Sequence, residues 1–171
     1  MKKIAAKLFA YWVDRKNQKW INNPLEAQQK TLKFLVSSAQ NTTFGKDHNF
    51  STITDYKSFK KQVPVRNYEE IRAYVDRIVA GEKNVLWPGQ PLYLAKTSGT
   101  TSGAKFIPIT KDSMPTHITA ARDALLNYIH KTGNTNFVSG KQIFLQGSPI
   151  LKRKKGMELG RLAGRVAPCV P

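Results

Sequence analysis

Acidic side chains and cysteine are both scarce in this 171-residue sequence. Only 11 Asp and Glu residues stand against 28 Lys and Arg residues, which leaves a formal charge of +17. A chain this basic attracts phosphate groups, nucleic acids and anionic membranes. The sole cysteine, Cys169, excludes an intrachain disulfide and indicates a reducing compartment. We assign no role to its thiol.

Long apolar runs are also missing, because no stretch has the roughly 20 consecutive apolar residues of a membrane-spanning helix. The start, MKKIAAKLFAYWVDRK, begins like a signal peptide, but Lys7 interrupts its apolar run and no small-residue cleavage site follows. We interpret it as a mature amphipathic helix of a cytoplasmic protein. Its apolar stripe is expected to pack on a core rather than on a membrane. That stripe consists of Ile4, Leu8, Tyr11 and Trp12.

The basic residues are spread from Lys2 to Arg165 instead of gathering on one element with aromatic residues between them. Nucleic-acid binding is therefore the less favoured interpretation of the charge. The alternative is that the chain is part of a longer protein whose remainder carries the acidic residues. The ending RLAGRVAPCVP, which has no polar tail or helix cap, favours that alternative.

Residues 1–90 are predicted to be mainly helical. The sequence NPLE, residues 23–26, offers an N-cap asparagine, a first-turn proline and a capping-box glutamate for a helix that runs to about Ala39. The polar NTTFGKDHNFS, residues 41–51, is expected to be a loop. The next segment, ITDYKSFKKQ, is expected to be a short helix that Pro64 closes.

A further helix is predicted between an N-cap at Asn67 and a terminating glycine at Gly81. Glu69 and Glu70 suit the positive end of its dipole, so no general-base role is needed to explain them. Its apolar residues recur at helical spacing and are expected in a core. They are Ile71, Tyr74, Val75, Ile78 and Val79.

Strands are predicted only in residues 91–171, at LYLAK, KFIPI and KQIFLQG. A helix from Lys111 to His130, capped by Gly133, separates the second strand from the third. Its one-sided apolar face comprises Ile118, Ala121, Leu125, Tyr128 and Ile129. A helical lead-in followed by alternating strands and helices predicts an α/β fold.

The loop TSGTTSGAKF, residues 97–106, concentrates hydroxyl residues, glycines and a lysine between two predicted strands. Glycines let successive backbone N–H groups form a nest for an anion, to which hydroxyls and Lys105 add donors. A Walker A loop does not fit, because Ala104 and Phe106 occupy its second glycine and its Ser/Thr position. A polyphosphate site and a plain hairpin loop are the two interpretations of this composition.

TSGTTSGAK is similar to the phosphate-binding signature of the adenylate-forming superfamily, which includes acyl-CoA synthetases and luciferases. Longer stretches closely resemble bacterial members of the Gretchen Hagen 3 family of acyl-acid amido synthetases. These stretches are TTFGKDHNF, VPVRNYEEIRAYVDRIVAGEKNVLWPG, the loop with FIPIT after it, and GKQIFLQGSP. The likeness begins at about Asn41 and is weaker before it. Family members are much longer, so the resemblance implies their amino-terminal part.

This resemblance implies a ligase that adenylates a carboxylic acid with ATP, releases pyrophosphate and joins the acyl group to an amino acid. Fixed donors and a lysine would stabilise the charge on the departing pyrophosphate. By resemblance, the phosphate-binding residues are Ser98, Gly99, Thr100, Thr101, Ser102, Gly103 and Lys105. Mg²⁺ is expected beside the phosphates, but this loop offers no carboxylate, so we expect its ligands outside this segment.

The family's later motifs for adenine, ribose and magnesium are not found here, so we expect these residues to be inactive alone. One alternative is an acyl-CoA-synthetase-like enzyme, and another is a non-catalytic basic module that binds phosphate or nucleic acid. GSP, residues 147–149, is either part of an acyl pocket or a turn. The basic run LKRKKG, residues 151–156, is interpreted as a solvated loop. Structural roles are expected for the scattered histidines His48, His117 and His130.

Overall fold

The computed structural model describes residues 1–97, 105–139 and 152–160. Helices and strands alternate after a run of helices, which confirms the α/β class. The elements are α1 (Lys2–Ile21), α2 (Pro24–Ala39), α3 (Thr43–Asp47), η1 (Phe50–Thr52), α4 (Tyr56–Gln62), α5 (Tyr68–Val79), β1 (Tyr93–Lys96), β2 (Phe106–Ile109), α6 (Met114–Thr132), η2 (Asn136–Val138), β3 (Lys152–Lys154) and β4 (Met157–Gly160).

The four described strands form one sheet in the order β2-β1-β4-β3. β1 pairs antiparallel with β2 and parallel with β4, and β3 pairs antiparallel with β4. Successive side chains of a strand point to opposite faces. On one face Leu94 packs with Ile78 of α5, and on the other Tyr93 packs with Ile109. The predicted strands LYLAK and KFIPI are therefore confirmed as the centre and one edge of the sheet.

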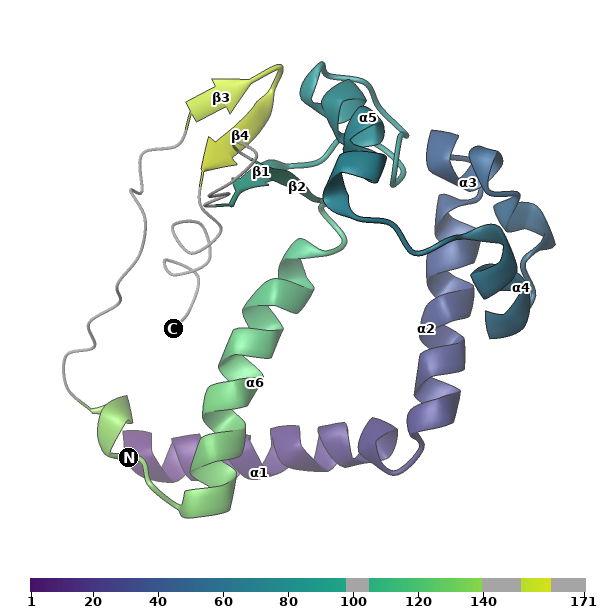
Figure 1. Ribbon diagram of the computed structural model, residues 1–171. Coiled ribbons are helices and arrows are strands. Elements are labelled where there is room, and N and C mark those ends of the chain that lie inside the picture. Colours follow the sequence, from purple (N-terminus) through teal and green to yellow (C-terminus); the bar gives the residue numbers. More distant parts are fainter. Residues whose placement is uncertain (98–104, 140–151, 161–171) are drawn as a thin grey trace.

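Helix α1 lies at the base of the molecule, and α6 rises from it toward the sheet (Figure 1). The two helices meet through Ala10 and Val13 of α1 and Leu126 and Ile129 of α6. The small Ala10 side chain, which is fully buried, lets the helices approach closely at that point.

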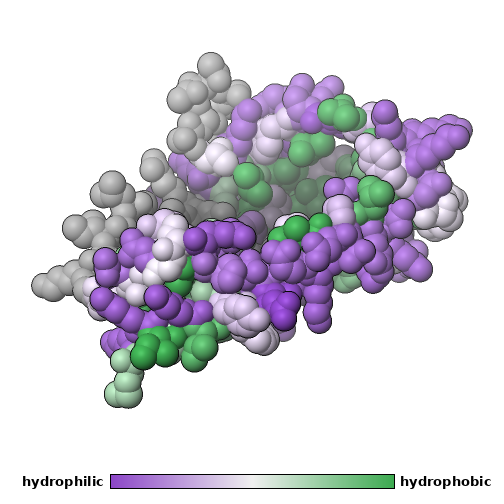
Figure 2. All heavy atoms as spheres, turned by 90° about the horizontal axis from the view of Figure 1, so that it is seen from below, coloured by the Kyte–Doolittle hydropathy of each residue, from purple (hydrophilic) through white to green (hydrophobic). Residues whose placement is uncertain are grey.

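The predicted core stripe of α1 is wrong. Its members keep 67%, 66%, 51% and 60% of their surface exposed, and they are Ile4, Leu8, Tyr11 and Trp12. Large apolar side chains recur around most of this helix, so their spacing could not show that the alanine side meets α6. Hydrophobic side chains consequently lie among hydrophilic ones on the surface seen from the base (Figure 2).

The predicted apolar face of α6 is only partly right. Ile129 is buried as expected, and Ile118 is half-buried, but Leu125 and Tyr128 are exposed while Leu126 takes the buried position. Adjacent leucines at positions 125 and 126 fit either face by pattern alone. The predicted cap at Gly133 is confirmed, because its φ is 69° and its N–H donates to the Ile129 carbonyl at 2.8 Å.

Two predicted helix starts have different outcomes. Asn67 caps α5 in a capping box with Glu70, with bonds of 3.2 Å and 2.6 Å. The predicted capping box at Asn23 is wrong, because this side chain makes no cap bond and donates instead to the Lys19 carbonyl. Its expected partner Glu26 pairs with Lys30 in the next turn at 2.6 Å.

Residues 41–51, predicted as a loop, contain α3 and the first two residues of η1. The Thr42 hydroxyl accepts the Gly45 N–H at 3.0 Å and donates to the Ala39 carbonyl at 2.7 Å. Gly45 lies so close to α2 that an added Cβ would stand 2.1 Å from the Ala39 carbonyl oxygen. The prediction missed this tight turn between α2 and α3, because a mostly polar composition is also typical of a loop.

Residues 152–154 of the basic run LKRKKG form the exposed strand β3 rather than a loop, and the turn at Gly156 joins it to β4. A row of cationic side chains suits a sheet edge, because it discourages pairing with other chains. The predicted strand at residues 141–147, the GSP turn and Cys169 lie outside the described residues. In the described segments, no helix is both long and apolar enough to cross a bilayer.

Candidate phosphate-binding site

The β1–β2 hairpin brings the two ends of the predicted phosphate loop together. Lys96 lies opposite Phe106 in the ladder, and the Thr97 N–H donates to the Lys105 carbonyl at 3.0 Å. Six of the predicted phosphate-binding residues, from Ser98 to Gly103, lie outside the described residues. Lys105 is the predicted site residue that the structure places, at the point where the loop returns to the sheet.

The Lys105 side chain lies against the first turn of α5. Its ammonium is 5.2 Å from the centre of the Tyr68 ring and 3.8 Å from the Glu69 Oε1. About a third of the side chain stays exposed, 32%, so its charge is available to a ligand. A cation over an aromatic face and beside a carboxylate is held by two weak electrostatic contacts.

The Tyr68 hydroxyl is bonded to the residue that follows Lys105. It accepts the Phe106 N–H at 2.8 Å and donates to the Phe106 carbonyl at 3.3 Å. This single hydroxyl therefore satisfies both backbone polar groups of the first residue of β2. Tyr68 joins α5 to the exit of the loop across 38 residues of sequence.

Glu69 also bonds to its own helix. Its Oε2 accepts from Arg72 Nη1 at 3.0 Å, and Arg72 approaches Asp76 at 3.7 Å. The hydrogen bond with Glu69 raises the pKa of Arg72 above its ordinary value. The carboxylate beside Lys105 is thus shared between two cations, which leaves Lys105 only partly neutralised.

Sequence reasoning missed Tyr68 and Glu69. The cap at Asn67 explained the residues at the start of α5 without further function, and Glu69 was assigned to the helix dipole alone. No local pattern could show that this turn packs against the loop exit, because the contact depends on how α5 packs on the sheet.

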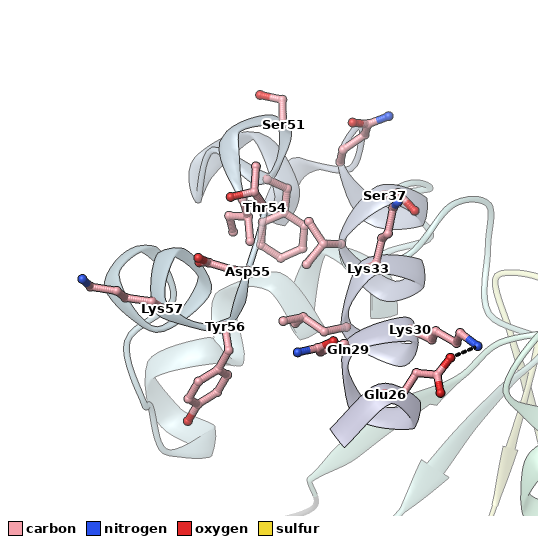
Figure 3. Close-up of a pocket in the computed structure, with 15 residues that line it drawn as sticks. Glu26, Gln29, Lys30, Lys33, Ser37, Ser51, Thr54, Asp55, Tyr56 and Lys57 are labelled. Atoms are coloured by element: carbon pink, nitrogen blue, oxygen red, sulfur yellow. Dashed lines mark ion pairs between the residues drawn. The ribbon is translucent and has the colours of Figure 1, made fainter. Parts of the chain in front are cut away.

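A separate groove of about 1010 Å³ lies between α2 and the η1–α4 segment (Figure 3). Its floor is apolar, from Leu32, Val36, Phe50 and Ile53. Its rim is polar, and there Lys30 pairs with Glu26. Lys105, the predicted phosphate-binding residue that the structure describes, does not line this groove, so we do not assign the groove to the phosphate site.

The side chains of His48 and His130 have protein contacts of a structural kind. His48 is buried, stacks on Phe44 at 4.0 Å and places its Nδ1 2.9 Å from the Phe44 carbonyl oxygen. His130 Nε2 lies 3.4 Å from Asp14 Oδ2, where it links α6 to α1. Among the described residues, no three His, Cys, Asp or Glu side chains gather as a metal site.

The sequence of the chain matches a known protein family. The model of the GH3 family N-terminal domain matches residues 15–167. The chain belongs to the GH3 family. Its membership confirms the resemblance inferred from the loop and its flanking motifs.

Named GH3 relatives are acid–amino acid synthetases. The chain is 34% identical over 114 residues to the indole-3-acetic acid-amido synthetase GH3.15 of Arabidopsis thaliana. The aligned region covers 65% of this chain and 19% of that protein. The chain is 26% identical over 136 residues to the jasmonoyl-L-amino acid synthetase JAR4 of Nicotiana attenuata. This alignment covers 78% of this chain and 23% of JAR4. The chain thus spans about a fifth of the length of these curated relatives.

Solved GH3 structures share the fold. The structure of the GH3.15 acyl acid amido synthetase matches with a TM-score of 0.71 and 26% identity over 84% of this chain and 26% of that chain. The structure of AtGH3.15 in complex with 2,4-DB matches with a TM-score of 0.72 and 24% identity, over 84% of this chain and 25% of that one.

Proposed function

We propose that this chain supplies the phosphate-binding part of an ATP-dependent acyl-acid amido synthetase. GH3 membership and the named activities of the relatives support the reaction class. The observation that carries the site is the partly exposed side chain of Lys105, which lies at the exit of a loop of glycines and hydroxyl residues. The substrates of this reaction are a small carboxylic acid and an amino acid, and the reaction takes place in the cytoplasm.

The residue chemistry suits a triphosphate. Lys105 offers a full positive charge, and the loop residues Ser98 to Gly103 offer hydroxyl and backbone donors that a phosphate accepts. Bound ATP would supply the adenylyl group that a carboxylate oxygen takes up at the α-phosphorus, with pyrophosphate as the leaving group. This chain's part is to hold the phosphates and to balance the negative charge that grows on the leaving pyrophosphate. Mg²⁺ would accompany the phosphates, and we assign it no ligand here.

We expect ATP binding, but no catalytic turnover, from these 171 residues. The chain spans only about a fifth of the relatives, 19% and 23% of their lengths. We therefore expect the 171 residues to bind ATP without catalysing exchange of pyrophosphate into ATP in the presence of a carboxylic acid. Measurable exchange by this chain would contradict that expectation.

Calorimetric titration with ATP tests the site. Lys105→Ala should weaken ATP binding roughly 10- to 100-fold, because a hydrogen bond to a charged group is worth about 1.5–3 kcal/mol. Lys60→Ala is the matched control, since Lys60 is an exposed lysine of α4. Equal ATP affinity of Lys105→Ala and the unaltered chain would overturn the assignment. Salt-sensitive DNA binding that survives Lys105→Ala would favour the basic binding module instead.

A further inference from the structure

We propose that Tyr68 is a positioning residue for Lys105, and that it directs the ammonium toward the phosphates. This inference rests on the proposed function, because Lys105 must first be a phosphate ligand. Tyr68 acts on Lys105 in two ways, through the backbone of the next residue and through its aromatic ring.

The peptide that follows the Lys105 Cα is held at both of its polar atoms. Its carbonyl accepts the Thr97 N–H at 3.0 Å, so the loop is closed at its base. The N–H of the same peptide, which belongs to Phe106, donates to the Tyr68 hydroxyl, and that hydroxyl donates in turn to the Phe106 carbonyl. These bonds tie the C-terminal side of the Lys105 Cα, from which the lysine side chain starts, to β1 and to α5.

The ring of Tyr68 then limits the directions that the side chain adopts. Lysine has a flexible four-carbon stem, and ordering it on binding an anion costs conformational entropy. A contact of 5.2 Å between the ammonium and the ring favours conformers that already lie over α5. Organising a ligand-binding group in advance raises affinity, because less freedom is lost on binding.

Tyr68 is itself well fixed. It is the first residue of α5, directly after the Asn67 cap, whose N–H is bonded by Glu70. The same helix is anchored in the core through Val75 and Ile78. The phenol thus extends from a rigid helix end to the loop exit.

A double-mutant cycle measures this coupling, with ATP and with inorganic pyrophosphate as probes. Tyr68→Phe keeps the ring and should weaken binding about 2- to 5-fold through loss of the hydroxyl bonds. Tyr68→Leu removes the ring as well and should weaken it about 5- to 20-fold. In a Lys105→Ala background, either change should alter affinity by less than about 2-fold, because the positioned group is gone.

Tyr74→Phe is the matched control. It removes a phenol hydroxyl from the same helix, but that hydroxyl donates to Asp47 at 2.8 Å. We expect it to change stability without changing ATP affinity. Thermal unfolding of every variant shows which of them fold, and the Tyr68→Phe cycle decides the question if Tyr68→Leu does not fold.

The outcomes separate the two proposals. If Lys105→Ala leaves ATP affinity unchanged, the proposed function is wrong whatever Tyr68 does. If Lys105→Ala weakens binding and folded Tyr68 variants bind as well as the unaltered chain, the positioning role is wrong. Equal losses from Tyr68→Phe with and without Lys105 would also overturn it, because Tyr68 would then act through the fold and not through the lysine.

Discussion

The α5–β1–β2 region and helix α1 are held in the molecule in different ways. Helix α5 has a reciprocal polar cap, buried residues in the core and a side chain bonded to the neighbouring strand. Helix α1 has no side-chain cap at its start, and its buried residues are Ala10 and Val13. Polar bonds at its first turn and burial together fix α5, whereas α1 is held along one side by its contact with α6, through Ala10, Val13 and the Asp14–His130 pair. The candidate site lies in the region of the first kind.

The largest expected effect compares one leucine from each region. Leu94→Ala should lower the free energy of unfolding by roughly 2–5 kcal/mol, because Leu94 is buried between the sheet and α5. Leu8→Ala should change it by less than about 0.5 kcal/mol, since Leu8 is 66% exposed on α1. Urea denaturation gives both values. Equal losses would mean that α1 packs as tightly as the sheet.

A substitution at the α1–α6 contact should separate stability from binding. Ala10→Leu places a large side chain where the fully buried alanine meets α6, and it should cost about 1–3 kcal/mol in urea denaturation. ATP affinity should stay unchanged, because the site is built on α5 and the sheet. A parallel fall in ATP affinity would show that the α1 contact and the loop exit are coupled.

The turn between α2 and α3 offers a smaller test of polar anchoring. Thr42→Val removes the hydroxyl that accepts from Gly45 and donates to Ala39, at a cost of about 0.5–2 kcal/mol. Thr42→Ser keeps the hydroxyl and serves as the control. In thermal unfolding, the unaltered chain and Thr42→Ser should have higher midpoint temperatures than Thr42→Val. The reverse order of midpoints would contradict the capping role.

The smallest expected effect concerns the charge beside Lys105. Glu69→Gln removes a carboxylate 3.8 Å from the ammonium and keeps the shape of the side chain. Loss of a half-exposed negative charge near an anion site should raise ATP affinity by no more than about 2-fold. Calorimetric titration at low and high salt measures it, and the gain should shrink at high salt. A large loss would mean that Glu69, rather than Tyr68, holds the lysine in place.

Local signals in the sequence predicted α5, the β1–β2 hairpin and the Gly133 cap. Each depends on residues close together in the chain, such as Asn67 with Glu70. The buried faces of α1 and α6 were predicted incorrectly or only in part, because several large apolar residues competed for one contact. Lys105 was predicted as a site residue and Tyr68 was not, since the two residues become neighbours only when α5 packs on the sheet.

Chemical-shift mapping of the ¹⁵N-labelled chain during ATP titration tests the central claim most directly. The account predicts saturable shifts for the amides of Thr97, Lys105 and Phe106, at the two ends of the loop. Amides of α1, such as that of Leu8, should not move. Shifts confined to α1 or to the basic strand β3, with none at Lys105 or Phe106, would contradict the assignment of the phosphate site.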